Sequence, residues 1–193
     1  MYGLPGQTLL ELEATLERAV ELGPDRIALF GYAHVPHMLP RQRRIDATAL
    51  PDQTERFAMA EFGYRLLTSA GYVAIGFDHF AKPGDPMARA LEQGRLHRNF
   101  QGFTDDPAKV LVGLGASAIG CFPDVLIQNE KNAGRYRMLL SQDRLPATHG
   151  VRRSVEDRRR GAVIEALLCY GRASLDADLA VEASAKLGPF AAH

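Results

Sequence analysis

The sequence has 193 residues, which is enough for one domain with a sizeable buried core, since domains usually run to about 100–200 residues. Lys and Arg together number 23, as do Asp and Glu, so the net charge is zero and no overall field favours nucleic acid or an anionic membrane. The hydrophobic share of 46% is that of a globular chain, and no apolar run approaches the roughly 18 residues of a membrane helix. We therefore expect a cytoplasmic protein without nucleic-acid or membrane partners.

The first part of the chain alternates between helix signals and short apolar runs. Thr8 and Glu11 form a capping box, which predicts that a helix begins there. The run RIALFGY is continuously apolar, which is typical of a strand covered on both faces of a parallel sheet. The expected elements are, in order, a helix over residues 8–23, a strand over 26–32, a helix over 52–71, a strand over 72–77 and a short helix over 86–92.

Two loops after the expected strands carry polar side chains. Residues 33–40 contain His34 and His37, and residues 78–86 begin with Asp78 and His79. In α/β folds ligands bind at the carboxyl ends of parallel strands, so both loops are candidate ligand-binding segments. Pro36 separates the first two histidines and no metal-binding motif accompanies them, so we predict no metal ligands.

Two further segments have unusual composition. Residues 94–103, GRLHRNFQGF, show neither strand alternation nor helical spacing, which predicts a loop selected for what its side chains contact. Residues 113–118, GLGASA, match a dinucleotide-binding pattern, but Gly120 and Pro123 interrupt the helix that would hold a pyrophosphate. Close approach of this glycine backbone to another chain segment or to a flat ligand is the better interpretation.

The last part of the chain is predicted to be mainly helical. Residues 109–120 are expected to form an apolar strand and a glycine-rich turn, and residues 124–129 another strand. Helices are then expected over 130–142, 154–170 and 176–187, and the loop over 146–150 is the best internal boundary.

Several side chains in this sequence have both a chemical and a structural interpretation. The two cysteines, Cys121 and Cys169, are too few for a disulfide framework, so we expect free, buried and inert thiols. Arginine clusters suit bidentate carboxylate binding but are also typical of solvated faces, in part paired with nearby acidic residues. These arginines are Arg41, Arg43, Arg44, Arg152, Arg153, Arg158, Arg159 and Arg160.

Five short segments together resemble one enzyme family. They are YGLPGQT (2–8), GYAHVP (31–36), GFDHFAKP (76–83), LHRNFQGFT (96–104) and GLGASAIG (113–120). In this order and spacing they resemble oxygen-independent coproporphyrinogen III oxidase, a radical S-adenosylmethionine enzyme family of haem biosynthesis. The resemblance runs along essentially the whole chain, but over only about the second half of the family's length. DHFAKP with HRNFQGF is its specific part, because related radical enzymes and haem chaperones share the first segment.

The resemblance implies a fold and a set of site residues. The fold is α/β, the C-terminal part of a partial TIM-like (β/α)6 barrel with a sheet extension, followed by a helical segment. Residues 1–128 would form the last barrel strands and the extension, and residues 129–193 the start of a helical C-terminal domain. Ala33 and Ile119 would contact S-adenosylmethionine, and Phe100 and Gln101 would line the catalytic cavity.

The implied reaction is the oxidative decarboxylation of coproporphyrinogen III propionates, initiated by a 5′-deoxyadenosyl radical, to give protoporphyrinogen IX. It needs S-adenosylmethionine and a [4Fe-4S] cluster, and Cys121 and Cys169 match neither the spacing nor the position of the family's cluster ligands. The isolated chain is therefore expected to be inactive and to need the N-terminal half of the barrel as a partner. An uncovered sheet edge also favours a homo-oligomer. Arg41, Arg43 or Arg44 are candidates for binding a propionate.

Two other interpretations remain open. One is a haem- or porphyrin-binding or chaperone-like module without radical chemistry, in which His34, His79 or His97 serves as an axial ligand. The other is a folded remnant without present activity.

Overall fold

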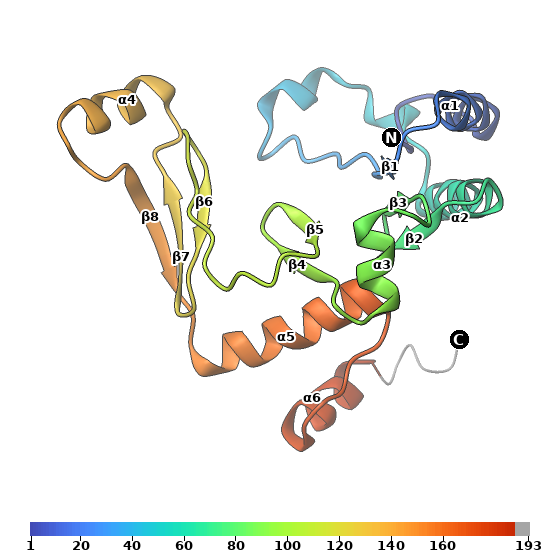
Figure 1. The fold of residues 1–193 in the computed structure, drawn as a ribbon. Helices are drawn as coiled ribbons and strands as arrows, with labels where there is room; N and C mark the ends of the chain where they lie inside the picture. Colours follow the sequence, from blue (N-terminus) through green and yellow to red (C-terminus); the bar gives the residue numbers. More distant parts are fainter. Residues whose placement is uncertain (188–193) are drawn as a thin grey trace. The chain divides into compact units, whose positions relative to one another are not determined.

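The computed structural model describes residues 1–187 (Figure 1). The chain divides into two compact units, an N-terminal unit of Met1–Leu96 and a C-terminal unit that starts at His97. Within the described range, no helix is both long enough and apolar enough to cross a membrane. The predicted division into residues 1–128 and 129–193 concerns domains of the longer family fold and stays a prediction.

The N-terminal unit contains three helices and three short strands among its described residues. They are α1 (Leu9–Leu22), β1 (Arg26–Ala28), α2 (Gln53–Ser69), β2 (Val73–Ile75), β3 (His79–Ala81) and α3 (Pro86–Glu92), with 3-10 turns η1 (Pro40–Arg44) and η2 (Ala47–Ala49) between β1 and α2. The capping box of Thr8 and Glu11 forms at the start of α1, and Asp52 with Glu55 forms another at the start of α2. The predicted starts of both helices are confirmed.

The sheet of this unit is antiparallel, with the strand order β1-β3-β2. The prediction of a parallel sheet was therefore wrong for these strands. Gly76 has a φ of 63°, a left-handed conformation that glycine adopts readily, and the turn that it belongs to reverses the chain after β2. The reversal makes residues 79–81 the central strand, although the sequence predicted a loop there. A parallel arrangement occurs in one isolated bridge, between Tyr2 and Gly31.

The core of the N-terminal unit lies where α1 and α2 pack together and against the sheet. Its buried residues are Leu12, Leu16, Leu29, Met59, Leu67, Tyr72 and Phe80. Gly63 lets Leu29 lie directly against α2, because a Cβ atom at this glycine would overlap the Leu29 side chain. The buried face of α2 therefore passes through Met59, Gly63 and Leu67, whereas Phe57 is 72% exposed.

One ion pair joins β1 to the start of α3. The Asp85 side chain, 7% exposed, accepts hydrogen bonds from Arg26 Nε at 2.8 Å and from the Met87 N–H at 2.8 Å. Burial alone raises the pKa of Asp85, but the hydrogen bonds from Arg26 and Met87 outweigh it and hold this pKa below its usual value. The charged carboxylate therefore stabilises the fold above the unfolded-state pKa of about 4, and this contribution is lost as the pH falls through the folded-state pKa.

We expect Asp85→Asn to lower the Tm at pH 7, and we expect the difference from the parent chain to be smaller at pH 3, because the contribution of the charged carboxylate starts to be lost below the unfolded-state pKa of about 4. Differential scanning fluorimetry at both pH values measures this. Asp25→Asn is the matched control, because Asp25 pairs with Lys82 in an exposed position and should change the Tm little. A Tm difference for Asp85→Asn that is equal at pH 7 and pH 3 would contradict the prediction.

The C-terminal unit contains two small sheets and three helices among its described residues. The elements are β4 (His97–Asn99), β5 (Gly102–Thr104), β6 (Ile119–Cys121), β7 (Val125–Asn129), α4 (Ala133–Ser141), β8 (Ala147–Arg152), α5 (Val155–Tyr170) and α6 (Ala177–Leu187). β4 and β5 form an antiparallel hairpin, and β6, β7 and β8 form an antiparallel sheet in that order (Figure 1).

Two sequence predictions for this unit were wrong in detail. Residues 94–103, predicted as a loop, include β4 and lead into β5, because their backbone groups pair with each other rather than with a distant strand. Residues 146–150, predicted as a boundary loop, fall largely within β8, which pairs with β7. All six residues of β8 are exposed, so the sequence lacks the alternation of apolar and polar side chains that predicts a half-buried strand.

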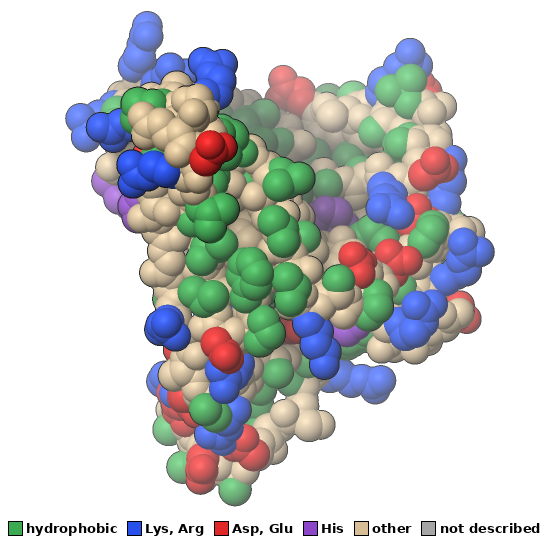
Figure 2. Space-filling view, turned by 60° about the vertical axis from the view of Figure 1, so that its left-hand side comes forward, with side chains coloured by type: hydrophobic (Ala, Val, Ile, Leu, Met, Phe, Trp, Pro, Cys, Tyr) green, Lys and Arg blue, Asp and Glu red, His purple; other side chains and the backbone are tan. Residues whose placement is uncertain are grey.

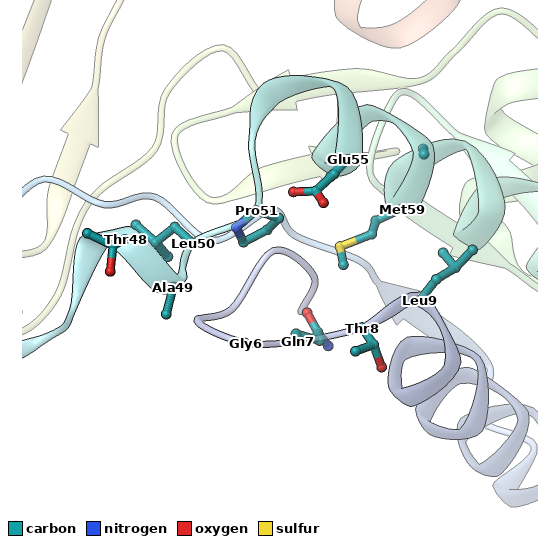
Figure 3. A pocket seen from close by; sticks show the side chains of 11 residues that line it. Gly6, Gln7, Thr8, Leu9, Thr48, Ala49, Leu50, Pro51, Glu55 and Met59 are labelled. Atoms are coloured by element: carbon teal, nitrogen blue, oxygen red, sulfur yellow. The ribbon is translucent and has the colours of Figure 1, made fainter.

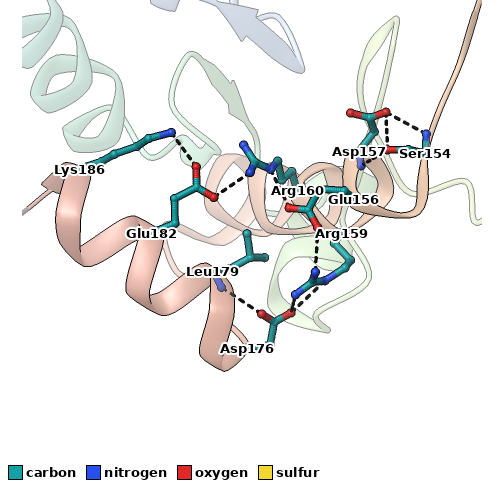
Figure 4. Close-up of polar contacts among 9 residues, drawn as sticks. All are labelled: Ser154, Glu156, Asp157, Arg159, Arg160, Asp176, Leu179, Glu182 and Lys186. Carbon is teal, nitrogen blue, oxygen red and sulfur yellow. Dashed lines mark hydrogen bonds and ion pairs between the residues drawn. The ribbon is translucent and has the colours of Figure 1, made fainter.

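Ion pairs link α5 to α6 (Figure 4). Arg159 pairs with Glu156 and Asp176, and Arg160 pairs with Glu156 and Glu182. The hydrogen bond from Arg159 is the main reason that the pKa of Asp176 is lowered. These two arginines and Arg158, which pairs with Asp124, belong to the predicted cluster and thus bind carboxylates, but these carboxylates belong to the chain itself.

Candidate functional site

Three of the five family-like segments lie side by side in the N-terminal unit. The Tyr2 N–H donates to the Phe30 carbonyl at 2.9 Å, and the Tyr32 N–H donates to the Tyr2 carbonyl at 2.8 Å. The Leu29 N–H donates to the Asp78 carbonyl at 2.8 Å, next to the pairing of β1 with β3. Residues 2–8, 31–36 and 76–83 therefore meet at one end of the small sheet, where β1 ends and β3 begins.

Ala33 is an exposed residue whose peptide is held by side chains from later in the chain. Gln42 Nε2 donates to the Ala33 carbonyl at 2.9 Å, and the Val35 N–H donates to Gln42 Oε1 at 2.6 Å. Arg56 Nη2 donates to the Tyr32 carbonyl at 2.7 Å. The loop that carries Ala33 is therefore fixed in place, which suits a residue that acts through its backbone.

Polar and aromatic side chains lie beside this loop. His79 Nδ1 lies 2.6 Å from Asp78 Oδ1, and the His79 and Phe30 rings form a T-shaped contact with ring centroids 5.5 Å apart. His34 Nδ1 lies 3.2 Å from the Tyr32 hydroxyl. In the part of the chain that the structure describes, no group of three or more His, Cys, Asp or Glu residues could hold a metal ion.

A hollow of about 540 Å³ lies on the same unit between residues 6–9 and residues 48–59 (Figure 3). Thr8 and Glu55, which line it, already take part in the capping boxes of α1 and α2. Gln7 Nε2 donates to the Met1 carbonyl at 3.3 Å. These polar groups therefore have structural partners, and we assign the hollow no ligand.

Phe100 and Gln101 form the turn between β4 and β5. Phe100 is 59% exposed, Gln101 is exposed, and the Gln101 N–H donates to Asn99 Oδ1 at 2.8 Å. The base of the hairpin is held by Glu165 of α5, whose Oε1 accepts from the Arg98 N–H at 3.0 Å and lies 3.3 Å from His97 Nδ1. The hairpin thus presents both predicted site residues at its tip.

Ile119 begins β6 and lies against the glycine-rich turn. A Cβ atom at Gly113 would lie 2.8 Å from the Ile119 carbonyl carbon, so only glycine fits this approach without a shift. Asn129, a buried amide, donates from Nδ2 to the carbonyls of Gly113 at 2.9 Å and Gly115 at 3.0 Å. The predicted close approach of the glycine backbone to another chain segment is confirmed, and a strand rather than a pyrophosphate-binding helix follows the turn.

The predicted site residues fall in both units. Ala33 belongs to the N-terminal unit, and Phe100, Gln101 and Ile119 belong to the C-terminal unit. The structure brings Phe100 and Gln101 together in one turn and places Ile119 on a different sheet. Sequence reasoning missed the residues that hold these loops, namely Gln42, Asn129 and Glu165. Of these three residues, Asn129 could have been noticed in the sequence, because it is a polar residue at the end of the apolar run VLIQN.

The cysteines of this chain do not fit a [4Fe-4S] cluster. The sequence contains two cysteines, and an iron-sulfur cluster is held by thiolates, usually four. Cys169 is 2% exposed, and its burial, together with the nearby Glu165 charge, raises the pKa of its thiol to about 11. Cys121 is half-buried, and its Sγ lies 3.7 Å from Arg153 Nη2.

We expect the two thiols to differ in reactivity. At pH 8 iodoacetamide should modify Cys121 and leave Cys169 unmodified in the folded chain, because a buried thiol with a raised pKa offers little thiolate. Peptide mass spectrometry measures both sites, and alkylation in urea is the control that should modify both. Modification of Cys169 as fast as Cys121 under native conditions would overturn the expectation.

Comparisons with known proteins agree on one group of relatives. No protein-family model matches the chain. An oxygen-independent coproporphyrinogen III oxidase of Cereibacter sphaeroides is 42% identical over 203 residues, covering 98% of this chain and 45% of the relative. The enzyme of the same name from Paracoccus denitrificans is 47% identical over 169 residues, covering 88% of this chain and 38% of the relative. The chain thus spans less than half the length of these two relatives.

A solved structure shows the same similarity in three dimensions. The coproporphyrinogen III oxidase of Escherichia coli, described as a radical SAM enzyme, matches with a TM-score of 0.87 and 36% sequence identity, over 98% of this chain and 46% of that one. The chain therefore has a mixed α/β fold found in a radical SAM enzyme. More specifically, it is homologous to part of the oxygen-independent coproporphyrinogen III oxidases, the family that its five short segments resemble.

Proposed function

We propose that this chain forms part of an oxygen-independent coproporphyrinogen III oxidase, which oxidatively decarboxylates propionate side chains of coproporphyrinogen III to vinyl groups. The observation that carries the proposal is the match over 98% of the chain to a relative of that name, together with the structural match of the same extent. The fixed loop of Ala33 and the exposed hairpin tip support it, because both present groups from a rigid scaffold.

In this proposal the chain shields and orients the reactants. S-adenosylmethionine and the [4Fe-4S] cluster would supply the radical chemistry when bound, with the cluster held by polypeptide other than this chain, since its own cysteines do not fit one. Ala33 and Ile119 would contact S-adenosylmethionine through backbone groups and a small apolar surface. Phe100 would cover a face of the tetrapyrrole, and the Gln101 amide would hydrogen-bond to it.

The same proposal includes the fold of a partial (β/α)6 barrel with a sheet extension and a helical segment. The barrel strands that this chain does not contain would be its partner, and a second copy of this chain is the alternative partner. Exposed apolar side chains support a partner, since Phe57 on α2 and Leu114 before β6 are both largely exposed. Figure 2 shows apolar side chains exposed between charged side chains of both signs.

A chimera tests the proposal. The chain is joined to the part of the Cereibacter sphaeroides relative that it does not cover, and the product is assayed anaerobically with coproporphyrinogen III, S-adenosylmethionine and a reductant. We expect protoporphyrin fluorescence after oxidation from the chimera and none from the isolated chain. In the chimera, Gln101→Ala should lower kcat/KM roughly tenfold, the size of a lost hydrogen bond in a desolvated site. Gln142→Ala, at the end of α4, is the matched control. A folded, cluster-loaded chimera without product would refute the proposal.

Haem binding without radical chemistry is a second candidate. It is favoured by one observation: Asp78 lies against His79 Nδ1, the arrangement in which a carboxylate orients a metal-binding imidazole. If this candidate is correct, haem added to the isolated chain gives a shifted Soret band that His79→Ala removes and His37→Ala retains. An unshifted band in the parent chain excludes it.

A further inference from the structure

A hollow in the C-terminal unit is lined by arginine side chains to which the proposed function gives no role. It has a volume of about 360 Å³ and is lined by Arg98, Arg153, Arg158, Gly161, Ala162, Ile164, Glu165 and Leu168. Arg98 comes from β4, and Arg153 precedes α5. Arg158, Gly161, Glu165 and Leu168 recur at spacings of three and four, so they share one face of α5.

The charge in this hollow is only partly compensated within the chain. Arg158 pairs with Asp124 at 2.7 Å, and Glu165 is the one carboxylate among the lining residues. Neither Arg98 nor Arg153 forms an ion pair with any described residue. The guanidinium of Arg98 instead lies over the Phe103 ring, 5.8 Å from its centroid.

Arg153 carries the strongest signal for an anion. It is half-buried, and its Nη2 donates to the neutral carbonyls of Phe122 at 2.5 Å and Pro123 at 3.0 Å. Its Nε is buried and has no hydrogen-bond partner among the described residues. Because neutral acceptors do not cancel a charge, the positive charge of this half-buried guanidinium favours an anion in the hollow that it lines.

Gly161 is a second, independent observation. Glycine in the middle of a helix is less stable than alanine, yet Gly161 stands in α5 on the face that lines the hollow. A Cβ atom there would meet nothing within 4 Å, so packing does not require the glycine. Its lack of a side chain keeps the floor of the hollow open.

We propose that this hollow binds an oxyanion, the phosphate or carboxylate group of a small molecule. The planar, forked donors of arginine suit both groups, and Arg98 and Arg158 approach the hollow from two different elements. The proposal does not rest on the proposed function, although Arg98 belongs to the hairpin that carries Phe100 and Gln101.

Isothermal titration calorimetry on the full chain at low ionic strength tests this, with inorganic phosphate and propionate as separate probes. Saturable binding of phosphate alone indicates a phosphate group as the natural ligand, and binding of propionate indicates a carboxylate. Arg98→Gln and Arg158→Gln should each weaken binding roughly tenfold through the loss of a charge-assisted hydrogen bond. Arg152→Gln removes the same charge from an exposed position on β8 and should leave the Kd unchanged.

Two further substitutions, one of charge and one of shape, separate a built site from a general basic field. Glu165→Gln keeps the oxygen that accepts from the Arg98 N–H but removes the negative charge, so it should tighten binding. Gly161→Leu fills the hollow without altering charge and should abolish binding while the chain stays folded by circular dichroism. The proposal is overturned if neither probe binds saturably, if Arg98→Gln and Arg152→Gln weaken binding equally, or if Gly161→Leu binds as the parent does.

Discussion

Gly113→Ala is expected to destabilise the C-terminal unit by about 3 kcal/mol, the upper range for forcing an extra methyl group into a packed site. The added Cβ would lie 2.8 Å from the carbonyl carbon and 2.9 Å from the carbonyl oxygen of Ile119. These are backbone atoms of a strand paired with β7, so they cannot move without disturbing the ladder, and the Asn129 bridge to Gly113 also resists a shift.

Urea unfolding followed by circular dichroism measures this loss, and hydrogen exchange of residues 113–129 locates it. Gly161→Ala is the control, because its Cβ meets open space in a helix and should stabilise by about 1 kcal/mol. Equal stability of Gly113→Ala and the parent chain would show that the turn has room that the structure lacks.

Leu12→Ala is expected to cost about 3 kcal/mol or more in the N-terminal unit, in the range for a fully buried leucine. Leu12 is 0% exposed and belongs to the core cluster in which α1 meets α2. The substitution removes the transfer free energy of the lost methyl and methylene groups and leaves a cavity that Leu16 and Leu67 fill only in part.

Leu10→Ala provides a matched control in the same helix, because Leu10 is 73% exposed and should change the free energy of unfolding by about 0.5 kcal/mol or less. Thermal and urea unfolding of both variants measure the contrast. Similar losses for the two leucines would contradict the assignment of the buried face of α1.

The helices were predictable because their signals are local. Thr8, Asp52 and Ser154 each form a side-chain cap with a residue three positions later, so sequence spacing alone placed the starts of α1, α2 and α5. The sheets were predicted less well, since pairing depends on distant residues. The turn at Gly76 reverses the chain, so the sheet is antiparallel where a parallel sheet was expected, and β8 shows no alternation of apolar and polar side chains.

The candidate site could be read only in part for the same reason. A polar segment around Phe100 and Gln101 was evident from composition, but its pairing as a hairpin was not, and its attachment to Glu165 joins residues more than 60 positions apart. Ala33 and Ile119 have little chemistry of their own, so the resemblance to a family was needed to single them out. Gln42 holds the Ala33 peptide, but it stands among arginines in the sequence, and nothing in that stretch indicates that Gln42 holds a loop.

The three capping boxes also bear on how the chain is made. Each is complete within four consecutive residues, so the residues that mark the start of a helix are all present as soon as that short stretch leaves the ribosome. Strand β3 must meet β1, about 50 residues earlier in the chain, before the sheet closes, and by then the capping residues of α1 and α2 have both been synthesised. During translation the residues that start α1 and α2 would therefore be present before β3 pairs with β1 and the register of the sheet is fixed.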